Sequence, residues 1–140
     1  MADYQVHISQ AEHNEETANM LVHNPPHHDW GITAAFYAAI HYVESWLFNN
    51  KNGTKKHSET SVPLYNNGTR MYSFHTWRER LVKNNFGKNA WKSYMMLRNE
   101  SNNARYLINT GMPAPKYYSP KDAEDMILKD LAILKQEVGV

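Results

Sequence analysis

The chain has 140 residues, enough for one domain over residues 1–140 that buries its own hydrophobic core. It contains no cysteine, which excludes disulfides, thiolate metal sites and cysteine nucleophiles. Fifteen basic and fourteen acidic residues leave a net charge of +1, which excludes the strongly basic surface of a dedicated nucleic-acid coat protein.

The apolar residues are not arranged for membrane insertion or export. No apolar run approaches the roughly 20 residues that a membrane span requires. The N-terminal residues also lack the basic start and apolar stretch of a signal peptide. We therefore expect a cytoplasmic protein without membrane association.

Two helices are expected in the first third of the chain. The first covers about 9–22, because Ser9 and Glu12 have the spacing of a capping box and the prolines at 25 and 26 end the helix. The second begins after Asp29, a suitable N-cap. Its apolar residues recur at helical spacing: Ile32, Phe36, Ala39, Ile40, Val43 and Leu47.

A polar connection over residues 49–68 leads to a third and a fourth helix. Ser73 is expected to cap the third, which ends near Gly87, with Tyr72 and Trp77 as a hydrophobic staple. The fourth covers about 89–105. Its apolar side carries Trp91, Tyr94, Met95 and Leu97.

The last helix has the clearest start signal, because Ser119 is a suitable cap and Pro120 suits the first helical position. Its apolar stripe consists of Ala123, Ile127, Leu131, Leu134 and Val138. No segment alternates apolar and polar residues with the period of a strand. The sequence therefore predicts an all-α fold, an up-and-down bundle of four or five helices.

Three segments, in this order, are similar to elements of the HEPN family. In residues 29–44, a stretch rich in small and aromatic side chains leads to His41, as in the second helix of the family. Residues 73–78 resemble the Ser-His-x-x-Arg pattern of one subgroup, with Phe74 inserted between the serine and the histidine. Residues 94–97 and 101–106 resemble its Tyr-x-x-Leu and Ser-x-x-Ala-Arg-Tyr elements.

This resemblance implies a HEPN-like helical bundle that forms homodimers and works in prokaryotic defence, toxin–antitoxin pairs or RNA processing. Many members are metal-independent ribonucleases with an Arg-x(4–6)-His motif, and others have lost the motif and act as binding or scaffold modules. Here Arg98 and Asn99 lie where the Arg-Asn of the family often lies, but no histidine follows within reach.

The segment from Arg70 to His75 does have the spacing of the nuclease motif. With five arginines and eight histidines in the chain, chance alone supplies about one such pair. Arg70 is also followed by Met71 rather than by a polar residue, and it precedes the expected helix cap. The spacing therefore does not identify a nuclease motif.

Four residues are the candidates for catalysis. His75 and Arg78, one helical turn apart, suit phosphate chemistry, or they belong to an exposed polar face. His41 shares a helix face with Tyr37 and Glu44, and it either moves protons or is a core histidine bonded to a neighbouring helix.

Arg105 is the fourth candidate, and it either binds phosphate or satisfies the last carbonyls of its helix. We also expect His41 and Arg105 to lie within about 12 Å, in one polar cluster. The candidates for substrate binding are Tyr37, Tyr94, Arg98, Asn99, Ser101 and Tyr106.

No metal or cofactor is expected. His23, His27, His28 and Asp29 are close in sequence, but the two prolines prevent a helical pair of histidines and no second cluster completes a site. The aromatic residues at helical spacing are expected to pack in the core.

Two functions remain open at this point. The first is a metal-independent ribonuclease, in which a histidine deprotonates the 2′-hydroxyl and an arginine stabilises the charged phosphorane. The second is a catalytically silent bundle that binds a partner protein, such as a nucleotidyltransferase-type antitoxin, or a nucleotide. The pair His75 and Arg78 favours the enzyme, and the missing histidine after Arg98 favours the binding module.

Overall fold

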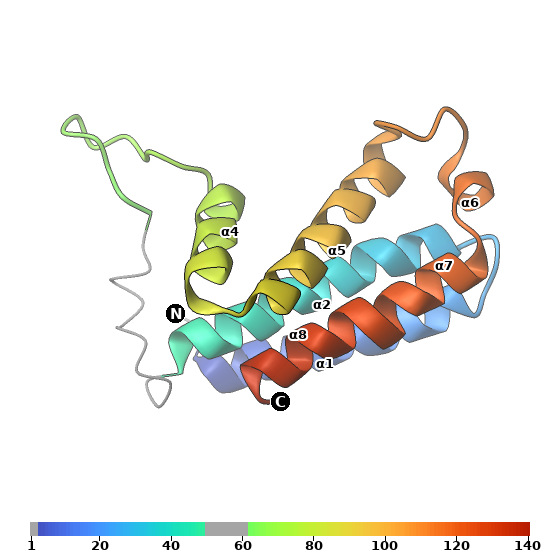
Figure 1. The fold of residues 1–140 in the computed structure, drawn as a ribbon, viewed down its shortest axis with the longest axis horizontal. Coiled ribbons are helices and arrows are strands. Elements are labelled where there is room, and N and C mark those ends of the chain that lie inside the picture. Colours follow the sequence, from blue (N-terminus) through green and yellow to red (C-terminus); the bar gives the residue numbers. More distant parts are fainter. Residues whose placement is uncertain (1–2, 50–61) are drawn as a thin grey trace.

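The computed structural model describes residues 3–49 and 62–140, and over these residues the fold is all-helical, as predicted (Figure 1). Outside the helices, Leu64 and Arg70 form an isolated antiparallel bridge. The helices are α1 (Tyr4–Val22), α2 (His28–Phe48), α4 (Phe74–Asn85), α5 (Lys88–Tyr106), α6 (Ala114–Tyr117), α7 (Pro120–Asp125), the π-helix η2 (Met126–Leu131) and α8 (Ala132–Val138).

The bundle consists of α1, α2, α5 and the continuous column α7–η2–α8 (Figure 1). In contrast, α4 stands at one end of the bundle and leans away from α5, so that the two helices diverge from the turn at Gly87. One flank of α5 therefore faces α4, and another faces the column α7–η2–α8. Within the described residues, no helix has both the length and the apolarity to cross a membrane.

Two predicted helix starts are wrong. The first helix begins at Tyr4 rather than after Ser9, because Oδ1 of Asp3 accepts hydrogen bonds from the backbone N–H groups of Gln5 and Val6 at 3.0 and 3.1 Å. The second begins at His28, so Asp29 lies in the first turn instead of capping it. A carboxylate there still interacts favourably with the positive end of the helix dipole.

The starts of α4 and α7 confirm the other predicted caps. Ser73 Oγ accepts a hydrogen bond from the backbone of Thr76, and the rings of Tyr72 and Trp77 stack at 5.6 Å. Ser119 and Asp122 form a reciprocal capping box. The π-helix that follows α7 was not predicted, since the apolar spacing there also suits an ordinary α-helix.

The most extensive contact between two helices joins α1 to α2. A Cβ atom on Gly31 would lie 2.5 Å from Cγ1 of Val22 and 3.2 Å from the carbonyl oxygen of Ala18, so only glycine fits. The small residues Ala38 and Ser45 of α2 are buried within this chain. They therefore belong to the core and expose no surface to a second copy.

Candidate functional site

The strongest polar cluster lies where α4 meets α2 and α5. Arg78 Nε of α4 lies 2.6 Å from Glu44 Oε1 of α2, and these side chains are only 14% and 15% exposed. One helical turn earlier, Nδ1 of His75 lies 3.4 Å from Nη1 of Arg78. The predicted pair of His75 and Arg78 therefore does project together, with Glu44 as a partner that the sequence could not assign.

The contact with Arg78 determines the tautomer of His75. A guanidinium N–H can only donate, so Nδ1 of His75 accepts and the ring hydrogen lies on Nε2. The pKa of His75 is lowered by partial burial and then by the charges of Arg78 and Arg105, with a smaller effect of Arg98. At neutral pH the ring is therefore uncharged and offers an N–H donor to solvent.

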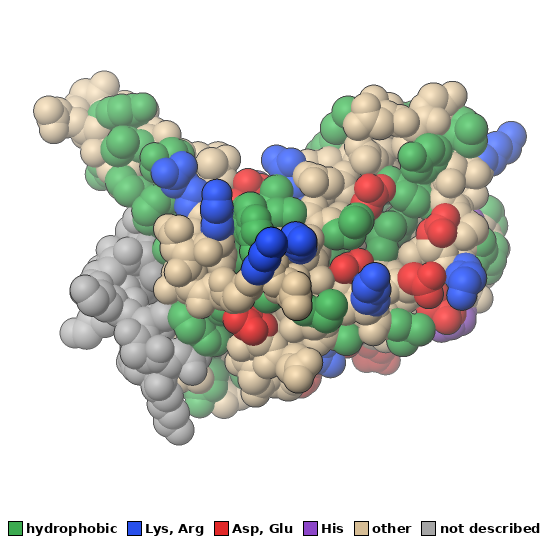
Figure 2. Space-filling model, viewed as in Figure 1, with side chains coloured by type: hydrophobic (Ala, Val, Ile, Leu, Met, Phe, Trp, Pro, Cys, Tyr) green, Lys and Arg blue, Asp and Glu red, His purple; other side chains and the backbone are tan. Residues whose placement is uncertain are grey.

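Two arginines of α5 face the same region. Arg98 Nε lies 2.9 Å from Glu79 Oε1 of α4, and its Nη1 donates to Asn99. This pair ties α5 to α4 and partly neutralises the cluster. Figure 2 shows Lys and Arg side chains gathered over α4 and the start of α5, on a face that is hollowed between the two helices.

Arg105 is held by three groups. Its Nε donates to the carbonyl of Ser101 at 3.3 Å, its Nη2 to Asn102 at 2.8 Å and its Nη1 to the hydroxyl of Tyr37 at 3.1 Å. The carbonyl of Ser101 lies one turn before Arg105 and is not among the last four carbonyls of α5, so this contact is not the helix-end role that we considered. The guanidinium also lies 5.2 Å from the exposed ring of Tyr106.

Two of the expected substrate-binding residues are buried. Tyr94 is fully buried beside the cluster, and burial raises its pKa to about 12 against the opposing charge of Arg78. Its hydroxyl makes no hydrogen bond of ordinary geometry. The hydroxyl of Ser101 is also buried without a partner, so both residues lie beneath the cluster rather than on its surface.

His41 lies at the edge of this cluster and pairs with a residue that the sequence did not single out. Its Nδ1 is 3.0 Å from Nδ1 of His7, and the two rings stack at 5.3 Å. Burial lowers the pKa of His41 first, and the neighbouring His7 and Arg78 lower it further, while Glu44 opposes them. The contact is thus a hydrogen bond to a neighbouring helix, and the charges of the cluster still reach the ring.

The histidines beside the connection between α1 and α2 have structural roles. His28 is buried, and its Nε2 donates to the carbonyls of Tyr118 and Pro115 at 2.6 and 3.1 Å. His23 pairs with Glu124 at 2.8 Å. Among the described residues, no three histidines or carboxylates converge as a metal site would require.

No protein-family model, curated protein or solved structure matches the chain. The function must therefore be argued from the cluster itself.

Proposed function

We propose that the chain is a HEPN-like helical domain that binds the phosphate groups of RNA or of a nucleotide in prokaryotic defence or a toxin–antitoxin pair, in the cytoplasm. One observation carries this proposal: Nη1 of Arg78 contacts the ring of His75, and the charges of Arg105 and Arg98 on α5 also act on that ring and help to keep it neutral. Three arginines against Glu44 and Glu79 leave one net positive charge, and guanidinium and imidazole N–H groups are the donors that phosphate oxygens accept.

Binding fits this geometry better than cleavage. A general base must offer an unprotonated nitrogen to the 2′-hydroxyl, but Nδ1 of His75 faces Arg78 and Nε2 carries the hydrogen. The arginines are also already held by carboxylate, amide or hydroxyl groups. Such an arrangement presents a fixed set of donors, which suits recognition of an anion.

A second candidate, the metal-independent ribonuclease, is favoured by the lowered pKa of His75, since a base must be uncharged to accept a proton. At 3.4 Å its contact with Arg78 is weak, so a bound phosphate could replace it and free Nδ1. That nitrogen would take the 2′-hydroxyl proton as the 2′-oxygen bonds to phosphorus. The bond from phosphorus to the 5′-oxygen then breaks, the proton passes to this oxygen, and a cyclic phosphate is left.

The deciding experiment measures binding and cleavage of a labelled single-stranded RNA, and binding of ATP, in excess EDTA. We expect binding without cleavage, and a loss of about tenfold or more in affinity for Arg105→Gln and for His75→Ala. Arg80→Gln is the matched control. Arg80 lies on α4, like His75, but its guanidinium is 4.7 Å from the centre of the Tyr72 ring and takes no part in the cluster. Cleavage that is abolished by His75→Ala and by Arg78→Ala would establish the ribonuclease instead. If the protein neither binds nor cleaves the RNA and does not bind ATP, both candidate functions are refuted.

Homodimerisation, and a nucleotidyltransferase-type antitoxin as partner, belong to the same proposal and follow from the family resemblance alone. Light scattering at micromolar concentration tests the dimer, and a strict monomer of 16.3 kDa would contradict it. Co-purification of the chain with a nucleotidyltransferase-type antitoxin tests the proposed partner.

A further inference from the structure

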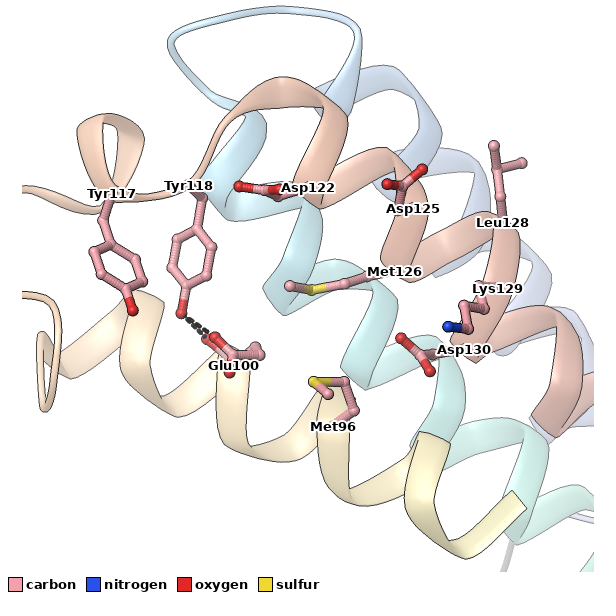
Figure 3. Close-up of a pocket in the computed structure, with 10 residues that line it drawn as sticks. All are labelled: Met96, Glu100, Tyr117, Tyr118, Asp122, Asp125, Met126, Leu128, Lys129 and Asp130. Carbon is pink, nitrogen blue, oxygen red and sulfur yellow. Dashed lines mark hydrogen bonds between the residues drawn. The ribbon is translucent and has the colours of Figure 1, made fainter. Parts of the chain in front are cut away.

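The opposite flank of α5 borders a groove that takes no part in the cluster around His75. The groove has a volume of about 720 Å³ and runs between α5 and the column formed by α7 and η2 (Figure 3). Cavities of this size accommodate small organic ligands. What the groove could bind follows from its walls.

The two walls carry alternating carboxylates and methionines (Figure 3). Asp122, Met126 and Asp130 lie in a row on α7 and η2, and Met96 and Glu100 face them from α5. From Asp122 to Asp130 there are eight residue steps, about 12 Å at the rise of an α-helix and less through the π-turn. A ligand that follows the row would therefore meet charge, apolar surface and charge in turn.

Tyrosines close one end of the groove. The rings of Tyr117 and Tyr118 meet edge to face at 4.9 Å, and the hydroxyl of Tyr118 donates to Oε2 of Glu100 at 2.5 Å. This hydrogen bond fixes the Glu100 carboxylate at the end of the groove and leaves acceptor capacity on it. Tyrosine faces also attract organic cations.

The charge of the groove is strongly negative. Its lining includes four carboxylates, on Glu100, Asp122, Asp125 and Asp130, and one cation, Lys129. No lysine or arginine of the described chain forms an ion pair with any of the four. Asp130 accepts a hydrogen bond from Ser93 Oγ at 3.1 Å and is half-buried. Burial raises the pKa of its carboxyl group, and the charge of Lys129 opposes this only in part, so a bound cation would further stabilise the charged form.

We propose that this groove binds a linear aliphatic polyamine of the spermidine class. The carboxylates are spread along the groove rather than converging, and the described residues hold no group of three ligands for a metal ion, so a compact divalent cation fits poorly. A polyamine places ammonium groups at intervals along a methylene chain. Its ammonium groups match Asp122, Asp130 and Glu100, and its methylenes match Met96 and Met126.

The proposal is independent of the function assigned to the His75 cluster, because α5 separates the two sites. Calorimetric titration of the RNA-free full chain with spermidine tests it directly. We expect saturable binding of one spermidine per chain, weakened about fivefold or more by Asp130→Asn and by Glu100→Gln. Asparagine preserves the acceptor for Ser93, and Asp125→Asn on the exposed rim provides a further variant in case either of the others fails to fold.

Two controls sharpen the test. Glu124→Gln removes a carboxylate from α7 that pairs with His23 outside the groove, so affinity for spermidine should not change. Lys129→Met removes the only cation of the lining and should increase affinity.

Absence of binding, or binding that the groove variants leave unchanged, would overturn the proposal. Equal displacement by equimolar Mg²⁺ would reveal a nonspecific acidic surface, and tighter binding of a trilysine peptide would indicate a protein partner; both results also overturn it.

Discussion

Arg78 and Glu44 form a nearly buried ion pair, with Nε and Oε1 2.6 Å apart, that joins α4 to α2. Apart from this pair, α4 is attached mainly to α5, through the turn at Gly87 and the contact between Glu79 and Arg98. The same arginine also contacts His75. The residue that sequence analysis assigned to phosphate chemistry therefore also holds its own helix in place.

Removing one partner of this pair should loosen α4. We expect Glu44→Ala to reduce the free energy of unfolding by about 1–3 kcal/mol, less than for a fully buried pair because both side chains retain some solvent contact. Hydrogen exchange should become faster in residues 74–85 and stay unchanged in α1. Equal acceleration throughout the chain would contradict a local role for the pair.

Stability should fall as the pH falls through about 6.5. The pKa values of His41 and His75 are lowered in the folded state, so between those values and 6.5 the unfolded chain binds more protons than the folded one. The stabilisation is thus fully present above pH 6.5 and is lost below it. His23, whose pKa is raised, acts in the opposite direction, but it is fully exposed and its effect is screened.

Urea unfolding between pH 5.5 and 8 measures this dependence. His41→Asn removes the imidazole that contacts His7. The free energy of unfolding should therefore depend less steeply on pH in this variant than in the wild type. An unchanged slope in this variant would rule out His41 as a contributor.

The helices that could be predicted from sequence are those whose signals are local. Ser73 and Ser119 form caps with groups three residues away, and the buried stripe from Ala123 to Val138 keeps a regular spacing. The start of α1 is not decided by local signals, because Asp3 and Ser9 are both suitable N-caps and the structure uses Asp3.

The candidate site could be predicted only where its members share a helix. The spacing of His75 and Arg78 places them on one face, and the structure confirms their contact. Their partners come from neighbouring helices: Glu44, Glu79 and His7. Arg78 and Glu44 are 34 positions apart in the sequence, and so are His41 and His7. No local pattern encodes such contacts, because they depend on how the helices are placed in the bundle.

His28 should be important for stability although it lies outside the cluster. Its Nε2 donates to two carbonyl groups around α6, so His28→Ala removes this donor from the buried carbonyl of Tyr118 and the partly buried carbonyl of Pro115. We expect a loss of about 1–3 kcal/mol in urea unfolding. The neighbouring His27 is exposed and makes no side-chain cap, so His27→Ala should change stability by less than about 0.5 kcal/mol. Equal losses in the two variants would contradict this assignment.

The contact between α1 and α2 predicts a rescue experiment. Gly31→Ala forces a methyl group against Val22 and the Ala18 carbonyl, which should cost about 1–3 kcal/mol. Val22→Ala removes the nearer clash at the expense of a small cavity. The double variant should therefore be more stable than the sum of the two single changes implies, and strict additivity would indicate that the helices separate instead.

The protonation state of His75 provides the sharpest test of the site. Arg78 contributes the largest charge effect on this ring and also occupies its Nδ1, so Arg78→Ala should raise the pKa of His75 and release the Nε2–H tautomer. Nuclear magnetic resonance of labelled imidazole reports both quantities. Arg80→Gln should leave them unchanged, because Arg80 lies over the Tyr72 ring and does not act on His75. A pKa that is unchanged or lower in Arg78→Ala would show that the guanidinium does not control the imidazole, and the argument for a fixed set of phosphate donors would then fail.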